Sequence, residues 1–312
     1  GSMKAALIAG IVANNASGIG SGIKYNSYNT LESMELVLTN GLILDSSIPT
    51  ADSKFKENAP DIYSELIDIR EKIRSSTELS SLIKHKYRLK NTSGYSLNSF
   101  LDYETPIDIL THLMVGSEGT LGFISNVELR TIPIYEHKAT ALVFFNTLTE
   151  AAKFVPLIGK LDGAALEIMD EYALRAIKHV KGLPDIIYTD LPPGIAALLL
   201  EFENNDQQLL QQDVDQTNAL LTSADLYQGF SFSSSPPERE LLWSVRRELG
   251  PLHAANRPPG TTVLSEDVCF ETRDLSAAIS DLQTMFKQFG YKDAIIFGHS
   301  REGNLHFKLS ID

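Results

Sequence analysis

Cysteine is nearly absent from this sequence of 312 residues, which contains only Cys269. A single cysteine excludes a disulfide within the chain and any zinc or iron–sulfur site built from cysteines alone. This composition fits a reducing cytoplasm. Because Cys269 falls in a segment that is typical of a buried strand, we expect a small core side chain and not a reactive thiol.

Basic residues and long apolar runs are also scarce. Lysine and arginine number 27 against 40 aspartate and glutamate residues, a formal net charge of -13. Such a charge repels nucleic acid and anionic membrane surfaces, so neither is an expected partner. The longest apolar stretches, such as Ala196 to Leu200, have the length of a strand, and we predict no signal peptide or transmembrane segment. We therefore expect a soluble cytoplasmic protein; peripheral attachment to the inner face of the membrane stays open.

The length and the hydrophobic content of 43% are those of a globular chain with two domains. We place the boundary near Pro133, where glycine-rich turns give way to a regular alternation of strands and helices. The opening Gly1-Ser2-Met3 resembles the remnant of a removed tag and leads almost directly into an apolar run. This beginning suggests an excised segment of a longer protein.

The first domain is expected to combine short strands with a helical insertion. Strands are predicted at Ala5 to Val12, Met34 to Thr39 and Leu42 to Leu44, and Asn40-Gly41 between the last two is a strong hairpin signal. The insertion begins behind Pro60 and has four apolar residues at helical spacing: Ile62, Leu66, Ile69 and Ile73.

The remainder of the first domain holds a basic run and a glycine-punctuated strand. The run Lys84 to Lys90 is more typical of a solvated face than of a binding site. A turn follows at Asn91-Thr92-Ser93-Gly94, and the strand is expected from Gly116 to Ile124.

The second domain is expected to be an α+β layer. Its predicted strands cover residues 139–145, 165–169, 196–202, 226–232, 262–270 and 293–297. Helices are predicted to begin at Thr149, Asp170, Asp206 and Pro236. The clearest helix is capped by Asp274 and ended by Gly290, and its apolar face consists of Leu275, Ile279, Leu282, Met285, Phe286 and Phe289. We expect helices on one side of the sheet and the other side free to cover a ligand.

Two glycine-rich segments are candidate binding loops. Gly10 to Gly20 combines small residues with Asn14, Asn15 and Ser17 just after the first predicted strand, and small side chains let backbone N–H groups approach a phosphate. Gly116 to Gly122 permits the same close approach. Spacing alone favours ordinary turns, because neither segment is a GxGxxG or a P-loop motif.

A later segment, Gly298 to His306, carries two histidines that are seven residues apart across a turn. His299 and His306 can converge there as ligands of a divalent metal or as substrate contacts. A lone histidine is more often structural, so the pair is suggestive and no more.

The helix behind Pro236 is a candidate anion site. Trp243, Arg246 and Arg247 share a helical face, which would aim a guanidinium beside an aromatic wall to hold a carboxylate bidentately. A surface arginine against a buried tryptophan is an equal alternative.

Together and in this order, these segments resemble the FAD-linked oxidases and dehydrogenases of the vanillyl-alcohol-oxidase type, in the branch of the D-lactate and D-2-hydroxyglutarate dehydrogenases and the glycolate oxidase flavin subunit. The most specific match is Val115 to Ile124, which is similar to the family's GSEGTLG strand. Gly10 to Gly18, continued by Asn26 to Leu31, resembles the second FAD-contacting region. The segments Arg257-Pro258-Pro259-Gly260 and Glu266-Asp267-Val268 look closest to large bacterial members that fuse the flavin module to an iron–sulfur module.

The resemblance implies an α+β fold with two parts. Residues 1–133 would be the C-terminal portion of a vanillyl-alcohol-oxidase-type FAD-binding domain, and residues 134–312 a ferredoxin-like antiparallel-sheet substrate (cap) domain. It places the first FAD subdomain before residue 1 and the family's late EHG motif after Asp312. We therefore expect a chain that lacks both and binds FAD weakly or not at all, with any iron–sulfur module further downstream.

The resemblance also assigns site residues. The FAD pyrophosphate and flavin side would be held by Gly10, Ala13, Asn14, Asn15, Ser17 and Gly18. The adenosine or ribityl portion would be lined by Gly116, Ser117, Gly119 and Ile124. Arg246 would hold the substrate carboxylate, and Asn304 would contact substrate or flavin. His299 and His306 would bind a divalent metal (Zn, Mn or Fe) or the substrate hydroxyl.

The implied function is oxidation of a D-2-hydroxy acid, such as D-lactate, to the 2-oxo acid by hydride transfer to flavin N5. The electron acceptor would be an iron–sulfur module, a quinone or a cytochrome. Two alternatives stay open. One is a flavin oxidase that passes electrons to oxygen, and the other is a non-catalytic docking module with a structural histidine turn.

Overall fold

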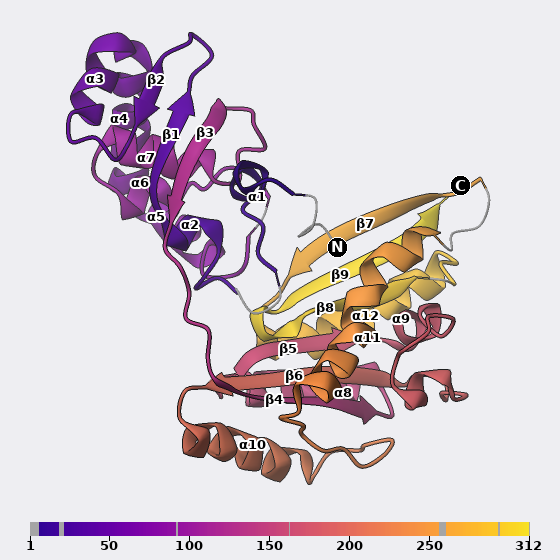
Figure 1. Ribbon diagram of the computed structural model, residues 1–312. Helices are drawn as coiled ribbons and strands as arrows, with labels where there is room; N and C mark the ends of the chain where they lie inside the picture. Colours follow the sequence, from indigo (N-terminus) through magenta and orange to yellow (C-terminus); the bar gives the residue numbers. More distant parts are fainter. Residues whose placement is uncertain are drawn as a thin grey trace. The chain divides into compact units, whose positions relative to one another are not determined.

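The chain divides into two compact units, residues 2–133 and 134–312, called here the N-terminal and C-terminal units (Figure 1). The structure is a computed structural model that describes residues 6–18, 22–91, 93–161, 163–255, 260–292 and 294–311. The segment 257–259 of the predicted Arg-Pro-Pro-Gly match lies outside the described residues. Within these ranges, no helix is both long and apolar enough to cross a bilayer.

The N-terminal unit is built on a small antiparallel sheet in the order β2-β1-β3. Its strands are β1 (Leu31–Val37), β2 (Ile43–Asp45) and β3 (Phe123–Leu129). The predicted hairpin between β1 and β2 is confirmed, with Val37 paired to Ile43. Gly41 adopts φ +82° in the connecting turn, a conformation that favours glycine.

Among the described residues of this unit, one helix lies directly before β1 and five lie between β2 and β3. Their bounds are α2 (Ser27–Thr30), α3 (Ala51–Asn58), α4 (Pro60–Ser75), α5 (Thr77–Lys86), α6 (Ser99–Asp102) and α7 (Pro106–Met114), with α2 directly preceding β1. The helix predicted behind Pro60 is α4 and is confirmed. Its buried face is narrower than expected, because Leu66 and Ile73 are buried whereas Ile62 is 41% exposed.

The strand predicted at 5–12 is wrong, because the described part of this segment forms helix α1 (Ile8–Asn14). Ala9, Val12 and Ala13 pack against the core, a spacing that fits one face of a helix and not alternate residues of a strand. A short apolar run does not distinguish these two structures by periodicity. The glycine-rich segment therefore follows a helix C-terminus and not a strand.

The strand predicted from Gly116 begins later than expected, at Phe123. The preceding residues form turns in which Gly116, Glu118 and Gly119 all have positive φ. These left-handed conformations are incompatible with a strand ladder, so the glycines punctuate a loop.

The C-terminal unit contains one antiparallel sheet of six strands in the order β4-β6-β5-β8-β9-β7. The strands are β4 (His137–Phe145), β5 (Gly163–Met169), β6 (Ala196–Asn204), β7 (Thr262–Cys269), β8 (Ile295–His299) and β9 (Asn304–Ile311). This confirms the α+β class. The strand predicted at 226–232 is wrong, since only isolated bridges from Leu226 to Phe145 and from Ser233 to Thr140 occur there.

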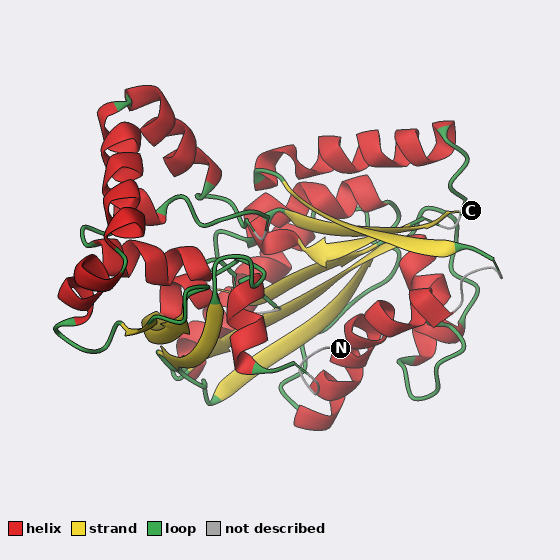
Figure 2. Cartoon of the chain, turned by 90° about the horizontal axis from the view of Figure 1, so that it is seen from above, coloured by secondary structure: helices red, strands yellow, loops and turns green. Residues whose placement is uncertain are grey.

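Helices pack on both faces of this sheet, contrary to the expectation of one free face (Figure 2). Helices α8 (Leu148–Ile158), α10 (Gln207–Leu221) and α12 (Leu275–Gln288) share a core with one face. Helices α9 (Glu171–Ala176) and α11 (Pro236–Ala255) share a core with the other. The central strands are apolar on both sides, as Phe144 and Phe145 show, so both faces need cover.

Helix α12 follows its predicted face only in part. Met285 and Phe289 are 44% and 67% exposed, whereas Leu275 and Ile279 are fully buried. Asp274 stands at the N-cap position but its side chain makes no capping hydrogen bond, because its backbone is already helical.

The buried strand expected around Cys269 is also wrong. Strand β7 lies at the edge of the sheet and most of its residues are exposed. Cys269 is half-buried and its Sγ lies 3.1 Å from the carbonyl oxygen of Glu302.

The contact between β8 and the start of β9 generates a stability prediction. A Cβ added at Gly298 would overlap the carbonyl oxygen of Asn304 and lie 2.8 Å from Cα of Leu305. We expect Gly298→Ala to lower the free energy of unfolding in urea by roughly 1–3 kcal/mol, because backbone must move. At Gly229 an added Cβ meets nothing within 4 Å, so Gly229→Ala is the matched control. Equal losses in both variants would contradict the tight contact.

Candidate functional site

The candidate site is organised by Glu167, the only charged residue in strand β5. Its side chain is 2% exposed and lies on the sheet face that α11 covers. A carboxylate buried to this degree is costly unless charged or hydrogen-bonded partners surround it. The position therefore requires cationic neighbours from other elements.

Two such neighbours bind Glu167, one to each oxygen. Arg246 of α11 donates from Nε to Oε2 at 2.7 Å, and Nδ1 of His299, at the end of β8, lies 2.7 Å from Oε1. Burial acts to raise the pKa of Glu167, but the charges and hydrogen bonds of His299 and Arg246 outweigh it and the pKa is lowered. Glu167 is thus ionised at neutral pH and holds both partners.

Arg246 packs against an aromatic ring, although not the one expected. Its Cζ lies 4.8 Å from the ring centroid of Phe297, whereas Trp243 donates from Nε1 to Glu201 at 2.7 Å. The aromatic wall is therefore Phe297, and the prediction of Trp243 is wrong. Arg247 is not part of the cluster, since neighbouring helical residues point about 100° apart, and it forms an exposed pair with Glu240 at 2.6 Å.

The structure brings the two predicted histidines together on one sheet face. Phe297 of β8 pairs with His306 of β9, and the ring centroids of His299 and His306 lie 5.1 Å apart at an interplanar angle of 89°. Because ionised Glu167 accepts from Nδ1 of His299, the neutral ring has its proton there. Nε2 of His299 is then the nitrogen with a lone pair for a metal or a substrate hydroxyl.

A second carboxylate, Asp267 on β7, stands beside this pair. Its Oδ1 accepts a hydrogen bond from Nδ2 of Asn304 and lies 3.5 Å from Nδ1 of His306. Asn304 also donates to the carbonyl oxygen of Val268 at 3.1 Å. Asn304 is therefore linked to His306 through Asp267, and its contact with substrate or flavin stays a prediction.

The cluster can bind an anion. Among the described residues, the Arg246 guanidinium hydrogen-bonds only through Nε, so both Nη groups are available for a carboxylate. Lys308 lies on the same face, with Nζ 5.7 Å from the Phe297 ring centroid, and burial together with the charge of Arg246 lowers its pKa. In the described ranges no group of three metal-ligating residues occurs, so the two histidines would need a further ligand.

Sequence reasoning missed Glu167 and Lys308. For Glu167 the signal was present, because one acid inside an otherwise apolar strand needs a partner. For Lys308 no pattern along β9 marks it, since only the register of β9 against β8 brings it to Phe297. Asp267 was noticed only as part of a family match.

In the N-terminal unit, the structure brings the two glycine-rich segments together. Gly116 donates its N–H to the carbonyl of Val12 at 3.2 Å, and Glu118 donates to that of Ala13 at 2.9 Å. Asn14 Nδ2 also donates to the Glu118 carboxylate at 2.6 Å. These bonds fasten the second loop to the C-terminal end of α1.

The backbone cradle expected for a phosphate is not what this junction offers. The N–H groups of residues 11–15 bond within α1 and its cap; that of Asn15 bonds Ile11 and Val12, and a helix C-terminus is unfavourable for anions. Side chains remain: Ser117 Oγ is buried without a partner in the described ranges, and Asn15 Nδ2 donates no hydrogen bond there. These two polar groups fit a ligand.

The other predicted cofactor residues are placed as follows. Ser17 Oγ donates to the carbonyl of Gly22 at 2.9 Å. Gly10 lies on an exposed face of α1, and Gly18 and Gly119 are exposed. Ile124 is 6% exposed, and its side chain belongs to the apolar core of the N-terminal unit.

Comparison with known families decides the identity of this fold. Residues 134–312 match the family described as FAD linked oxidases, C-terminal domain. The chain belongs to the FAD-linked oxidases. The predicted resemblance is confirmed, and FAD is the cofactor that the family implies.

Several known proteins are similar to the chain along the sequence. D-2-hydroxyglutarate dehydrogenase of Haemophilus influenzae is 24% identical over 98% of the chain and 31% of its own length. The mitochondrial cytochrome-dependent D-lactate dehydrogenase of Arabidopsis thaliana is 28% identical over 77% of the chain and 41% of its own length. The chain thus spans less than half of these relatives.

Solved structures of FAD-linked oxidases share the fold. Alkyldihydroxyacetonephosphate synthase superposes with a TM-score of 0.55 at 14% identity, over 97% of this chain and 48% of that one. p-Cresol methylhydroxylase superposes with a TM-score of 0.54 at 10% identity, over 96% and 54%. At such identities the likeness concerns the fold alone.

The Glu167 network predicts a specific loss of stability. Glu167→Gln leaves Arg246 buried without its counter-charge, and breaking such a pair costs about 3–5 kcal/mol of unfolding free energy. Glu240→Gln, in the exposed pair with Arg247, is the control and should cost about 1 kcal/mol or less.

The pH dependence checks the cause of that loss. A carboxylate whose pKa is lowered by folding stabilises the protein above its unfolded pKa of about 4.3 and loses this contribution as pH falls through the lowered value. The difference in urea unfolding free energy between wild type and Glu167→Gln should therefore shrink on acidification. A difference that stays constant from neutral to acidic pH would contradict ionisation of Glu167.

Proposed function

We propose that this chain is part of an FAD-dependent dehydrogenase that oxidises a D-2-hydroxy acid, such as D-lactate or a similar acid, to the 2-oxo acid. The observation that carries the proposal is the shared carboxylate of Glu167, which holds Arg246 at 2.7 Å on one oxygen and His299 at 2.7 Å on the other. A carboxylate-binding group and a proton-accepting group are thus fixed side by side. Substrates with adjacent carboxylate and hydroxyl groups match this pair.

Arg246 is assigned to the substrate carboxylate. Its Nε donates a hydrogen bond to Glu167, and its guanidinium group packs against the ring of Phe297. The two Nη groups therefore form a rigid fork of the kind that pairs bidentately with a carboxylate. Fixing one end of the substrate in this way orients the C2 hydrogen, and orientation of this kind accelerates a reaction without any new chemistry.

His299 and His306 are assigned to the 2-hydroxyl group. Nε2 of His299 can accept the hydroxyl proton or bind a divalent metal (Zn, Mn or Fe) together with His306 and a further ligand. A bound metal would lower the pKa of the hydroxyl. Asp267 and Asn304 position His306, because Asp267 lies 3.5 Å from its Nδ1 and accepts a hydrogen bond from Asn304.

Residues 1–133 are proposed as the FAD-binding portion and residues 134–312 as the substrate (cap) domain. Asn15 and Ser117 would hold FAD, because both keep unsatisfied polar atoms at the junction of the glycine-rich loops. FAD supplies the hydride acceptor at N5 when bound. An iron–sulfur module, a quinone or a cytochrome would then take the electrons. Two relatives with the name dehydrogenase support this class, and a third has the name of a glycolate oxidase subunit.

The test is anaerobic reduction of the FAD-loaded full-length protein by D-lactate or D-2-hydroxyglutarate. Bleaching of the flavin absorbance by either acid, followed by slow reoxidation in air and fast reoxidation by a quinone, would support the dehydrogenase. Fast reoxidation by oxygen would indicate an oxidase instead. Unchanged absorbance with every D-2-hydroxy acid, or failure to bind FAD, would indicate the docking module.

We predict that Arg246→Lys lowers kcat/KM about ten- to a hundredfold in the full-length protein. Lysine cannot reproduce the fork, and one lost hydrogen bond to a charged group is worth roughly 1.5–3 kcal/mol. Arg247→Lys is the matched control on the same helix and should change kcat/KM little, because Arg247 is exposed and paired with Glu240. A larger loss for Arg247→Lys would refute the assignment of Arg246.

A further inference from the structure

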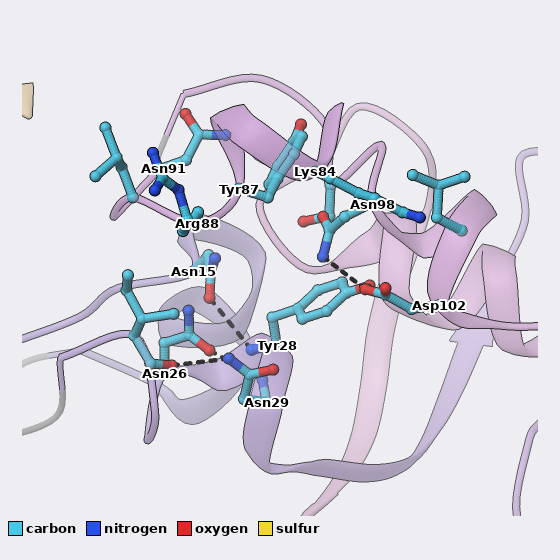
Figure 3. Close-up of a pocket in the computed structure, with 14 residues that line it drawn as sticks. Asn15, Asn26, Tyr28, Asn29, Lys84, Tyr87, Arg88, Asn91, Asn98 and Asp102 are labelled. Atoms are coloured by element: carbon cyan, nitrogen blue, oxygen red, sulfur yellow. Dashed lines mark hydrogen bonds between the residues drawn. The ribbon is translucent and has the colours of Figure 1, made fainter. Parts of the chain in front are cut away.

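Figure 3 shows a polar pocket in the N-terminal unit, lined by Asn15, Tyr28 and Asp102 among others, which falls within the portion already proposed to bind FAD. A different pocket lies within the C-terminal unit, at the end of the sheet where β5 ends and β8 begins. It is bounded by the first turn of α9 and the last turns of α12. Its volume is about 580 Å³, within the range of roughly 300–1,000 Å³ that small-molecule sites have.

The floor of this pocket lies on the opposite face of the sheet from Arg246. Its strand residues Ala294 and Ile296 belong to the core that α12 shares, whereas Phe297, beside Arg246, belongs to the core that α11 shares. Successive residues of a strand point to opposite faces of the sheet. A ligand on this floor would therefore not occupy the site of Arg246.

The end of α12 forms one wall of the pocket. Gly290 adopts φ +77°, a conformation that favours glycine, and the chain turns back on the helix there. The backbone N–H of Tyr291 donates to the carbonyl of Phe286 at 2.8 Å, and that of Gly290 donates to the carbonyl of Lys287 at 3.3 Å. These two bonds are the Schellman pattern of a helix C-terminus, which brings the residue after the glycine against the last helical turns. Tyr291 accordingly packs against the core cluster that contains Phe286.

The pocket has an apolar floor and aromatic walls. Phe286, Ala294 and Ile296 are buried and line it from below. Tyr291 stands on the α12 side, and Tyr172, which is 48% exposed, stands on the α9 side. Aromatic rings of this kind cover a flat apolar body by offset or edge-to-face contacts. The lining therefore suits a ligand with an aromatic ring system.

Two lysines give the pocket its charge. Lys287 and Lys292 both line it, and within the described residues neither side chain makes a hydrogen bond or an ion pair. Lys287 also lies in the last turn of α12, where a cation suits the helix dipole. Lys292 lies beyond the helix, so the dipole does not account for it. In a chain of net charge -13, two such cations at one pocket favour an anionic ligand.

The acids of the lining do not supply the missing counter-charge. Glu171 pairs with Arg175 at 2.7 Å, outside the pocket. Asp170 accepts from the backbone N–H groups of Ala173 at 2.7 Å and Ile296 at 2.9 Å. Burial raises the pKa of Asp170 to about 7, so its charge is only partial at neutral pH. The negative partner of the two lysines therefore has to come with a ligand.

We propose that this pocket binds a small aromatic acid, with the ring system between Tyr172 and Tyr291 and the carboxylate at Lys287 and Lys292. An ammonium group acts as a point charge and needs no fork geometry, so one carboxylate satisfies both lysines. A purely polar anion would leave the apolar floor uncovered, and a neutral aromatic would leave the charge unmatched. The site uses neither flavin nor hydroxy acid and is independent of the proposed function.

The experiment is calorimetric titration of this chain with 2-naphthoate, repeated with 2-naphthamide, which lacks the charge, and with acetate, which lacks the rings. We expect 2-naphthoate to bind one site, at least tenfold more tightly than either of the other two. Lys287→Ala and Lys292→Ala should each weaken its binding about fivefold. Lys160→Ala is the matched control, because Lys160 is exposed in the same unit and outside the pocket lining.

The aromatic wall has its own test. Tyr172→Ala should weaken binding of 2-naphthoate about tenfold, whereas Tyr172→Phe keeps the ring and should change it little. Because Tyr172 is largely exposed, neither change disturbs the core. Circular dichroism and thermal melting check that every variant stays folded.

Each part of the proposal can fail separately. Absence of 2-naphthoate binding, or unchanged affinity in both lysine variants of the pocket, would remove the site. A loss in Lys160→Ala as large as in Lys287→Ala would show a general effect of charge and overturn it as well. Equal binding of 2-naphthamide would remove the anionic contact, and equal binding of acetate or an unchanged affinity in Tyr172→Ala would remove the aromatic one.

Discussion

The C-terminal unit depends on the buried charge of Glu167. A carboxylate that is 2% exposed must be neutralised by neighbours, and both of its oxygens are occupied, one by a helix and one by a strand. The ion pair therefore fixes the rotation of α11 against the sheet as well as the orientation of His299. Replacing Glu167 by an apolar residue would remove this constraint and would leave the Arg246 guanidinium buried without its counter-charge.

Rigidity of the histidine pair follows from its position in the sheet. His306 on β9 pairs with Phe297, two residues before His299 at the end of β8. Each histidine is paired with a carboxylate residue of a flanking strand, His299 with Glu167 on β5 and His306 with Asp267 on β7. Side chains on paired strands have little freedom to separate. The carboxylates beside Nδ1, at 2.7 Å for His299 and 3.5 Å for His306, restrict the rotation of the rings. A site of this design needs no loop closure to bring its parts together.

Sequence patterns predicted the elements with strong periodicity and missed the features that depend on tertiary contact. The helix behind Pro60 was correct because its apolar residues recur at helical spacing, and the strand at 196–202 was correct because it is an almost continuous apolar run of strand length. The apolar run before Asn14 was assigned to a strand because its length fits either structure, and only packing against the core selects the helix. Arg246 lies in the Glu167 cluster, but its aromatic neighbour is Phe297 and not Trp243, since strand register decides which ring lies beneath α11.

The bonds that hold the site join residues far apart in the chain. Arg246 and His299 are separated from Glu167 by 79 and 132 positions. Contacts of this sequence distance form only after long loops have closed, so they belong to the late stages of folding. The same bonds are absent from any intermediate in which β5, α11 and β8 are not all in place. Ligand binding at this site therefore reports that β5, α11 and β8 have come together.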